Sequence, residues 1–152
     1  MEQLWNSINN EKDIEFVSTL FGYLYDACIK EVKYISGSYV NADSRMKPID
    51  DQRQIYLIIQ MQNSEHSVIE FLFDGVELFN LVPSKEDYDS IISGLLLKIK
   101  DNHIYFANSP EITIDELDKN SSWITWIKAK SLKWREINKY IGDSLVYVHR
   151  DF

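Results

Sequence analysis

Two β-rich segments around a short polar stretch constrain the fold of this chain most strongly. They lie within residues 54–73, QIYLIIQMQNSEHSVIEFLF, and residues 63–65 form the polar middle. This pattern is typical of an antiparallel hairpin, in which side chains alternate between two faces. One face is then wholly apolar, with Ile55 opposite Phe73, Leu57 opposite Phe71 and Ile59 opposite Ile69. The other face is mixed, so we expect this hairpin at the centre of a sheet, with one core face and one half-covered face.

A second hairpin is predicted around Asp101 and Asn102, which read as a two-residue turn. Its register separates apolar from polar pairs. The expected pairs are Leu97 with Phe106, Ile99 with Ile104, Lys98 with Tyr105 and Lys100 with His103. A helix beginning near Asp87 is the alternative for residues 88–97, although Gly94 and the run after it favour a strand. Residues 123–134 predict a strand, with Trp126 and Trp134 sharing a face, that is either covered on both sides or has one face at an interface.

The helical part of the chain is predicted near its start. Asn10 is a candidate N-cap with Asp13 in the capping-box position, and Gly22 occupies the position that follows a helix end. Between them, Ile14, Val17 and Phe21 form one apolar stripe. Trp5 and Ile8, before the cap, are expected to fold back onto the sheet or the helix.

The remaining segments complete an α+β prediction for one domain spanning residues 1–152. Residues 28–35 predict a strand near a sheet edge, and residues 145–148 a short edge strand. Residues 41–51 and 108–122 read as long polar connections. We therefore expect a mostly antiparallel sheet of about five to seven strands, with the N-terminal helix packed on one face.

The charge of the chain restricts its partners. The formal net charge is −8, and no basic stripe is present that could displace counterions from nucleic-acid phosphates. An anionic membrane surface is disfavoured for the same reason. The single cysteine, and the absence of signal-peptide features and of a membrane-span-length apolar run, predict a cytoplasmic protein. The acidity suits either a basic protein partner or simple solubility.

No motif in the sequence predicts catalysis, a cofactor or a metal site. A nucleophilic Cys28 would require a nearby base, and the three histidines (His66, His103 and His149) are scattered. His66 and His103 are expected at hairpin tips, pointing to solvent, and Cys28 is more simply a small apolar residue. The acidic segment after residue 108 does not match a calcium loop, and no phosphate-binding glycine pattern occurs.

The aromatic and acidic residues are the one functional signal. Tryptophan commonly anchors protein interfaces, and carboxylates beside it would steer a basic partner. The candidate binding residues are Glu111, Asp115, Glu116, Asp118, Trp123, Trp126 and Trp134. Burial of every tryptophan in the core is the simpler interpretation. The alternatives to a protein-binding domain are a small-molecule-binding or enzymatic domain with a pocket between helix and sheet, and a homodimer.

Several short segments resemble a group of small bacterial domains found near polymorphic toxin loci. They are residues 24–28 (LYDAC), 36–40 (SGSYV), 59–62 (IQMQ) and 69–73 (IEFLF), together with Trp123-Ile124 and Lys133-Trp134-Arg135. Tyr25 stands where the group has histidine. The resemblance implies an immunity-like or accessory binding protein, with no assigned activity. The net charge of −8, the aromatic content and the lack of a catalytic motif add the expectation that such a protein would neutralise a basic toxin.

Overall fold

The computed structural model describes residues 4–49, 52–63, 65–120 and 123–146. Its helices are α1 (Glu11–Leu20) and α2 (Ile114–Asn120), with short 3-10 helices η1 (Gly22–Leu24) and η2 (Asn138–Tyr140). Its strands are β1 (Asn6–Ile8), β2 (Ala27–Ile35), β3 (Tyr39–Val40), β4 (Met46–Lys47), β5 (Gln54–Gln60), β6 (Val68–Asn80), β7 (Ile91–Ile92), β8 (Leu96–Lys100), β9 (His103–Ala107) and β10 (Trp126–Glu136).

The fold is α+β, as predicted, and is built around one eight-stranded antiparallel sheet. The strand order is β7-β2-β5-β6-β10-β9-β8, and β1 pairs with β10. The hairpin of β5 and β6 lies at the centre with the predicted register, Ile55 opposite Phe73 and Ile59 opposite Ile69. The β8–β9 register is also confirmed: both turn residues have positive φ, 51° at Asp101 and 60° at Asn102, as a type I′ turn requires.

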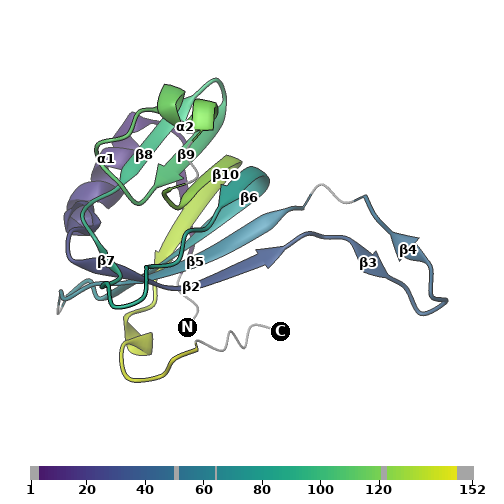
Figure 1. Ribbon diagram of the computed structural model, residues 1–152, viewed down its shortest axis with the longest axis horizontal. Helices are drawn as coiled ribbons and strands as arrows, with labels where there is room; N and C mark the ends of the chain where they lie inside the picture. Colours follow the sequence, from purple (N-terminus) through teal and green to yellow (C-terminus); the bar gives the residue numbers. More distant parts are fainter. Residues whose placement is uncertain (1–3, 50–51, 64, 121–122, 147–152) are drawn as a thin grey trace.

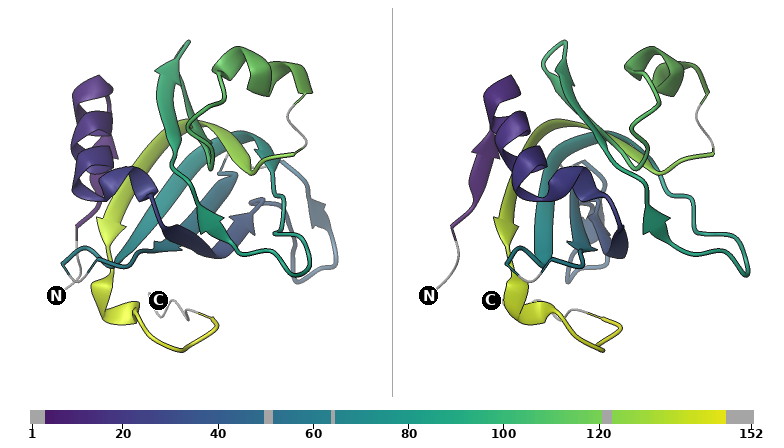
Figure 2. Two further views of the ribbon diagram at one scale, coloured as in Figure 1. Left: turned by 60° about the vertical axis from the view of Figure 1, so that its left-hand side comes forward. Right: turned by 90° about the vertical axis from the view of Figure 1, so that its left-hand side faces the viewer.

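Helix α1 begins and ends where the sequence predicts. The Asn10 side chain accepts a hydrogen bond from the backbone N–H of Asp13, and the Asp13 carboxylate accepts one from Asn9. Phe21 is the C-cap, and Gly22 follows with φ +58°. Ile14 and Val17 are buried against the sheet. Figures 1 and 2 show α1 lying across the side of the sheet that is enclosed by its curvature.

The curvature comes from the two long strands β6 and β10. Gly75 lies in β6 with φ +63°, and a Cβ there would lie 2.9 Å from the Lys130 side chain. The β6–β10 register shifts between Lys128, which pairs with Leu78, and Ala129, which pairs with Val76, so the extra residue of β6 is Glu77, two residues after Gly75. Within β10 the alternation breaks at Lys130 and Ser131, two consecutive exposed residues beside Gly75, so Ile127 and Trp134 both belong to the main core, whereas Trp126 faces the opposite side of the sheet. The prediction that Trp126 and Trp134 share a face is therefore wrong, because the side chains of β10 do not alternate strictly between the two faces of the sheet along the whole strand.

Two smaller apolar clusters lie on the outer side of the sheet. One is formed by α2 with β8, β9 and β10, and includes Leu117, Tyr105 and Trp126. The other contains Ile58, Val68 and Ile137, with Tyr140 of η2 packed against it. Both faces of the central strands are therefore covered, which is more than the half-covered outer face that the sequence predicts.

Two connections contain more regular structure than predicted. Residues 108–122 include α2, because Thr113 caps the helix: its Oγ1 accepts from the backbone N–H of Glu116 and donates to the Glu116 carboxylate. Residues 41–51 include β4, which pairs with β3. Over residues 88–97 the strand prediction is confirmed in preference to the helical alternative, since this stretch contains β7 and the start of β8. The strand count consequently exceeds the expected five to seven.

Strand β2 lies next to the sheet edge, as predicted, with only β7 beyond it. Strand β1 shows that the segment before α1 folds back onto β10, where Ile8 pairs with Leu132. Leu145 and Val146 are exposed and outside any strand, while residues 147–148 of the predicted edge strand lie outside the described residues.

Candidate functional site

The acidic candidate residues lie on or just before α2. Glu111 precedes the helix, Asp115, Glu116 and Asp118 are within it, and all four are exposed. Asp115 accepts a hydrogen bond from Lys100 Nζ at 3.1 Å, and this bond raises the pKa of Lys100. Because Asp115 and Glu116 also have local structural partners, substitution of Glu111 and Asp118 should disturb the fold least.

The three candidate tryptophans have different environments. Trp123 is 63% exposed, whereas Trp126 and Trp134 are only 7% and 6% exposed. Trp126 packs beneath α2, and Trp134 contacts Phe21 edge-on with ring centroids 5.6 Å apart. The two buried indoles are therefore part of the core and cannot contact a partner in this fold. The candidate surface is reduced to Trp123, Glu111 and the three acidic residues of α2, which together we call the α2 face.

The two described histidines do not point freely into solvent, contrary to prediction. His66 Nδ1 lies 3.0 Å from Glu136 Oε1, and its ring contacts Phe21 edge-on. His103 Nε2 lies 2.9 Å from Glu77 Oε1, and its Nδ1 lies 2.8 Å from the Asp101 carbonyl. Their carboxylate partners are far away in the sequence, so the sequence alone carried no signal for these pairs. His149 lies outside the described residues.

His103 belongs to a charged network on β6, β9 and β10. Its hydrogen bond lowers the pKa of the Glu77 carboxyl, and the second Glu77 oxygen lies 3.8 Å from Lys128 Nζ. A hydrogen bond with Tyr105 raises the pKa of Lys128. A lysine nucleophile or base requires a lowered pKa, since only the neutral amine reacts. Lys128 is therefore held in its charged form, and the network fits a structural role.

A buried ion pair is the site that the sequence did not reveal. Arg135 Nε donates to Glu70 Oε1 at 2.8 Å, with the two side chains only 8% and 1% exposed. The residues face each other across the β6–β10 ladder. The ring of Trp5 covers the guanidinium, with its centroid 4.3 Å from Arg135 Cζ. This arrangement seals the charges from water and ties residues before α1 to the outer face of the sheet.

The space between α1 and the sheet is nearly filled. The cavity lined there by Val17, Phe21, Phe71 and neighbouring side chains has a volume of only about 10 Å³, which is at the lower limit for one water molecule. A larger cleft of about 330 Å³ lies between Ile29 of β2 and residues 81–92. Several of its polar groups bond to one another or to local backbone: Ser84 with Ser90, and Asp89 with the backbone N–H of Ile91.

The described residues contain no group of three or more His, Cys, Asp or Glu side chains placed to hold a metal ion. Cys28 is half-buried in β2, opposite Gln60 and Ile91. Within the part of the chain that the structure describes, we find no helix with the length and apolar character needed to cross a membrane. Comparison with known proteins found no matching family model, curated protein or solved structure.

Proposed function

We propose that this chain is a non-enzymatic, cytoplasmic binding domain that neutralises a basic protein, in the manner of a toxin-immunity protein, through its α2 face. The observation that carries the proposal is the exposure of Trp123 in the same segment as four exposed carboxylates. A large exposed indole supplies an anchor, and the carboxylates supply attraction to a cationic partner.

The charge of the whole chain supports the same conclusion. At a net charge of −8, the molecule attracts cations at long range and repels nucleic acids and anionic membranes. The rival function, catalysis or ligand binding between helix and sheet, is less well supported because the cavity there holds only about 10 Å³.

The first experiment is an affinity capture from cells of the native host, with the tagged chain as bait and mass spectrometry as readout. We expect one stoichiometric basic protein, with the properties of a toxin. Recovery of no partner, or of an acidic one, would argue against the proposal.

The captured protein then allows a kinetic test. Reversal of Glu111 and Asp118 to lysine, at low ionic strength, should slow association by about tenfold or more, because steering acts on the association rate. Trp123→Ala should instead speed dissociation. The matched control is Glu11→Lys with Glu65→Lys, two exposed acids elsewhere with the same change in net charge. Equal association rates for the two double variants would show that binding does not use the α2 face.

A further inference from the structure

The cleft of about 330 Å³ lies where the curved sheet remains open. The strand order ends with β7 and β2 on one side and with β9 and β8 on the other. After β6 the chain crosses this opening to β7, which pairs with β2, and then returns to β8. Figure 1 shows β7 beside β2 and apart from β8. Small-molecule sites occur preferentially in the mouths of β-barrels, and this opening of a curved sheet is a comparable position.

The interior of the cleft is mainly apolar. Its most buried lining residues are Ile92 and Thr125, which are only 3% and 1% exposed. The Thr125 hydroxyl accepts a hydrogen bond from the backbone N–H of Val82, and the Thr125 N–H donates to Asn108 Oδ1. These bonds satisfy the polar groups of Thr125, so the interior presents mainly hydrocarbon. The apolar lining residues are Ile29, Leu81, Val82, Pro83, Ile91 and Ile92. A ligand that fills the cleft must therefore carry an apolar body.

The rim of the cleft offers hydrogen-bond acceptors and one negative charge. Asp89 is the one charged side chain of the lining among the described residues. One of its carboxylate oxygens accepts from the backbone N–H of Ile91 at 3.0 Å, and the second has no hydrogen-bond partner in the described part of the chain. The hydroxyls of Ser84 and Ser90 lie 2.8 Å apart, and their oxygens keep unused lone pairs. A primary ammonium group has three donors that match these acceptors, whereas an anionic ligand would meet Asp89 instead of a cation.

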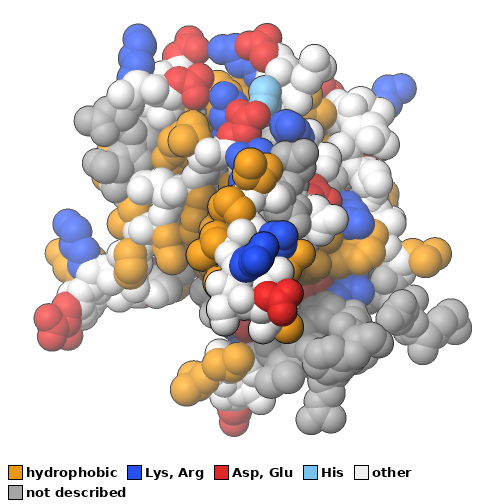
Figure 3. All heavy atoms as spheres, turned by 90° about the vertical axis from the view of Figure 1, so that its right-hand side faces the viewer, with side chains coloured by type: hydrophobic (Ala, Val, Ile, Leu, Met, Phe, Trp, Pro, Cys, Tyr) orange, Lys and Arg blue, Asp and Glu red, His pale blue; other side chains and the backbone are white. Residues whose placement is uncertain are grey.

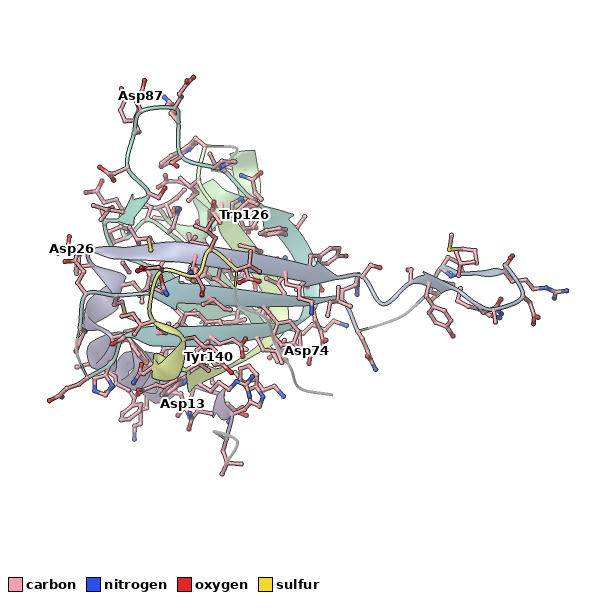
Figure 4. All side chains as sticks on the ribbon, turned by 90° about the horizontal axis from the view of Figure 1, so that it is seen from below. Asp13, Asp26, Asp74, Asp87, Trp126 and Tyr140 are labelled. Carbon is pink, nitrogen blue, oxygen red and sulfur yellow. The ribbon has the colours of Figure 1, made fainter. Side chains whose placement is uncertain are left out.

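The surroundings of the cleft add to its negative potential. The loop that borders it contains Glu86, Asp87 and Asp89 against one cation, Lys85. The cations of residues 37–49 belong to the arm formed by β3 and β4, and Figure 3, which looks along this arm, shows cationic side chains near its end. In Figure 4, Asp87 lies at the end of β2 opposite the arm. The arm therefore does not neutralise the loop, and the field at the cleft favours a cation.

We propose that the cleft binds a free small primary amine with a branched apolar body. Its ammonium group donates to Asp89 and to the hydroxyl pair of Ser84 and Ser90, and its hydrocarbon body contacts Ile29 and Ile91. The volume lies at the lower end of the range for ligand sites, which suits a compact molecule. A lysine side chain carries the same ammonium group, but its unbranched stem places less hydrocarbon against the apolar walls. The cleft is separate from the α2 face, so the two functions are tested independently.

The first test is a titration of the isotope-labelled chain with isoamylamine, followed by amide chemical shifts at neutral pH and low ionic strength. We expect saturable shifts centred on residues 81–92, 108 and 125. Each methylene group that becomes buried should strengthen binding about fourfold. Isoamylamine, with two more carbons than propylamine, should therefore bind about tenfold more tightly or better. Shifts that do not saturate, or equal affinities for the two amines, overturn the proposal.

Compounds with a related structure test the ammonium group and its source. Isoamyl alcohol has the same hydrocarbon body without the charge, and should bind about two- to fivefold more weakly than the amine, as expected for an exposed charge pair. Isovalerate, which reverses the charge, should bind more weakly still. Equal affinities for amine and alcohol would overturn ammonium recognition. Nα-acetyl-lysine methylamide represents a lysine of a protein partner, and tighter binding of this compound than of isoamylamine would overturn the assignment to a free small molecule.

Asp89→Asn tests the residue that binds the ammonium group. It keeps an oxygen for the backbone N–H of Ile91 but removes the charge, so isoamylamine should bind about two- to fivefold more weakly while isoamyl alcohol binds as before. Asp87→Asn is the matched control, because it makes the same change in charge in the same loop outside the cleft lining. Asparagine tolerates the φ of +66° at this position. Equal losses of amine affinity in the two variants would show that only the general field of the loop acts, and would overturn the site.

Discussion

The Glu70–Arg135 pair allows a sharp test of what holds the outer face of the sheet together. Glu70→Ala removes the carboxylate and leaves a guanidinium buried beneath Trp5 without that partner. Breaking a buried pair from one side typically costs about 3–5 kcal/mol, because the remaining charge is not compensated. For a chain of this size, each kcal/mol lowers the melting temperature by about 2–4 °C. We therefore expect a loss of about 6–20 °C.

Removing both charges should cost much less than removing one. In Glu70→Met/Arg135→Met, two apolar side chains of similar length replace the pair, and such replacements are often neutral or stabilising. The double-mutant cycle should consequently show strong coupling between the two sites. Lys100→Ala, which breaks the exposed pair with Asp115 (side chains 44% and 76% exposed), is the control and should change stability far less than Glu70→Ala, because solvent screens an exposed pair.

The assay is equilibrium urea unfolding followed by far-UV circular dichroism, with tryptophan fluorescence as a second probe of two-state behaviour. Unfolding free energies should be compared only among variants with equal denaturant dependence. Two results would refute the reasoning: a cost for Glu70→Ala as small as that for Lys100→Ala, or a double variant whose loss equals the sum of the two single losses.

Two further predictions concern the bulge and the charged network. Gly75→Ala should destabilise the chain by about 1–3 kcal/mol in the same urea assay, because the backbone has φ +63° and a Cβ would lie 2.9 Å from the Lys130 side chain. An unchanged urea midpoint of unfolding would show that the backbone at residue 75 accommodates a side chain without cost. The Glu77 pKa is lowered from 4.5 in the folded state, so its stabilising effect is present above about pH 4.5 and is lost as the pH falls through the folded value. Glu77→Gln should therefore lower the melting temperature at pH 6 and have a smaller effect at pH 3. An equal loss of melting temperature at both pH values would show that the ionised Glu77 carboxylate does not stabilise the fold.

Local signals predicted much of the fold. The β5–β6 and β8–β9 registers followed from alternation across short turns, and the limits of α1 followed from Asn10 and Gly22. Helix α2 was missed although Thr113 and Glu116 form a readable capping box; the acidic composition of the segment obscured it. The relative faces of Trp126 and Trp134 could not be read from strict alternation, because the alternation of β10 breaks at Lys130 and Ser131, beside the positive-φ Gly75 of a strand distant in sequence.

The candidate site was predictable only in part, for a similar reason. The exposure of the acidic residues follows from their charge, but a tryptophan is equally suited to a core and to an interface. Burial of Trp126 required α2, which was not predicted. The partners of His66, His103 and Glu70 lie on other strands, so these contacts follow from the sheet order, which no local pattern encodes.

That sheet order also determines when the protein can fold during synthesis. Strand β10 lies between β6 and β9, although both precede it in the chain. Until residue 136 has left the ribosome, a nascent chain exposes an unpaired edge of β6 and an unpaired edge of β9, because the strand that pairs with both has not yet emerged. Unpaired edges of this kind recruit other chains. The growing polypeptide should therefore depend on chaperones until β10 emerges, and messages truncated before that point should yield insoluble products.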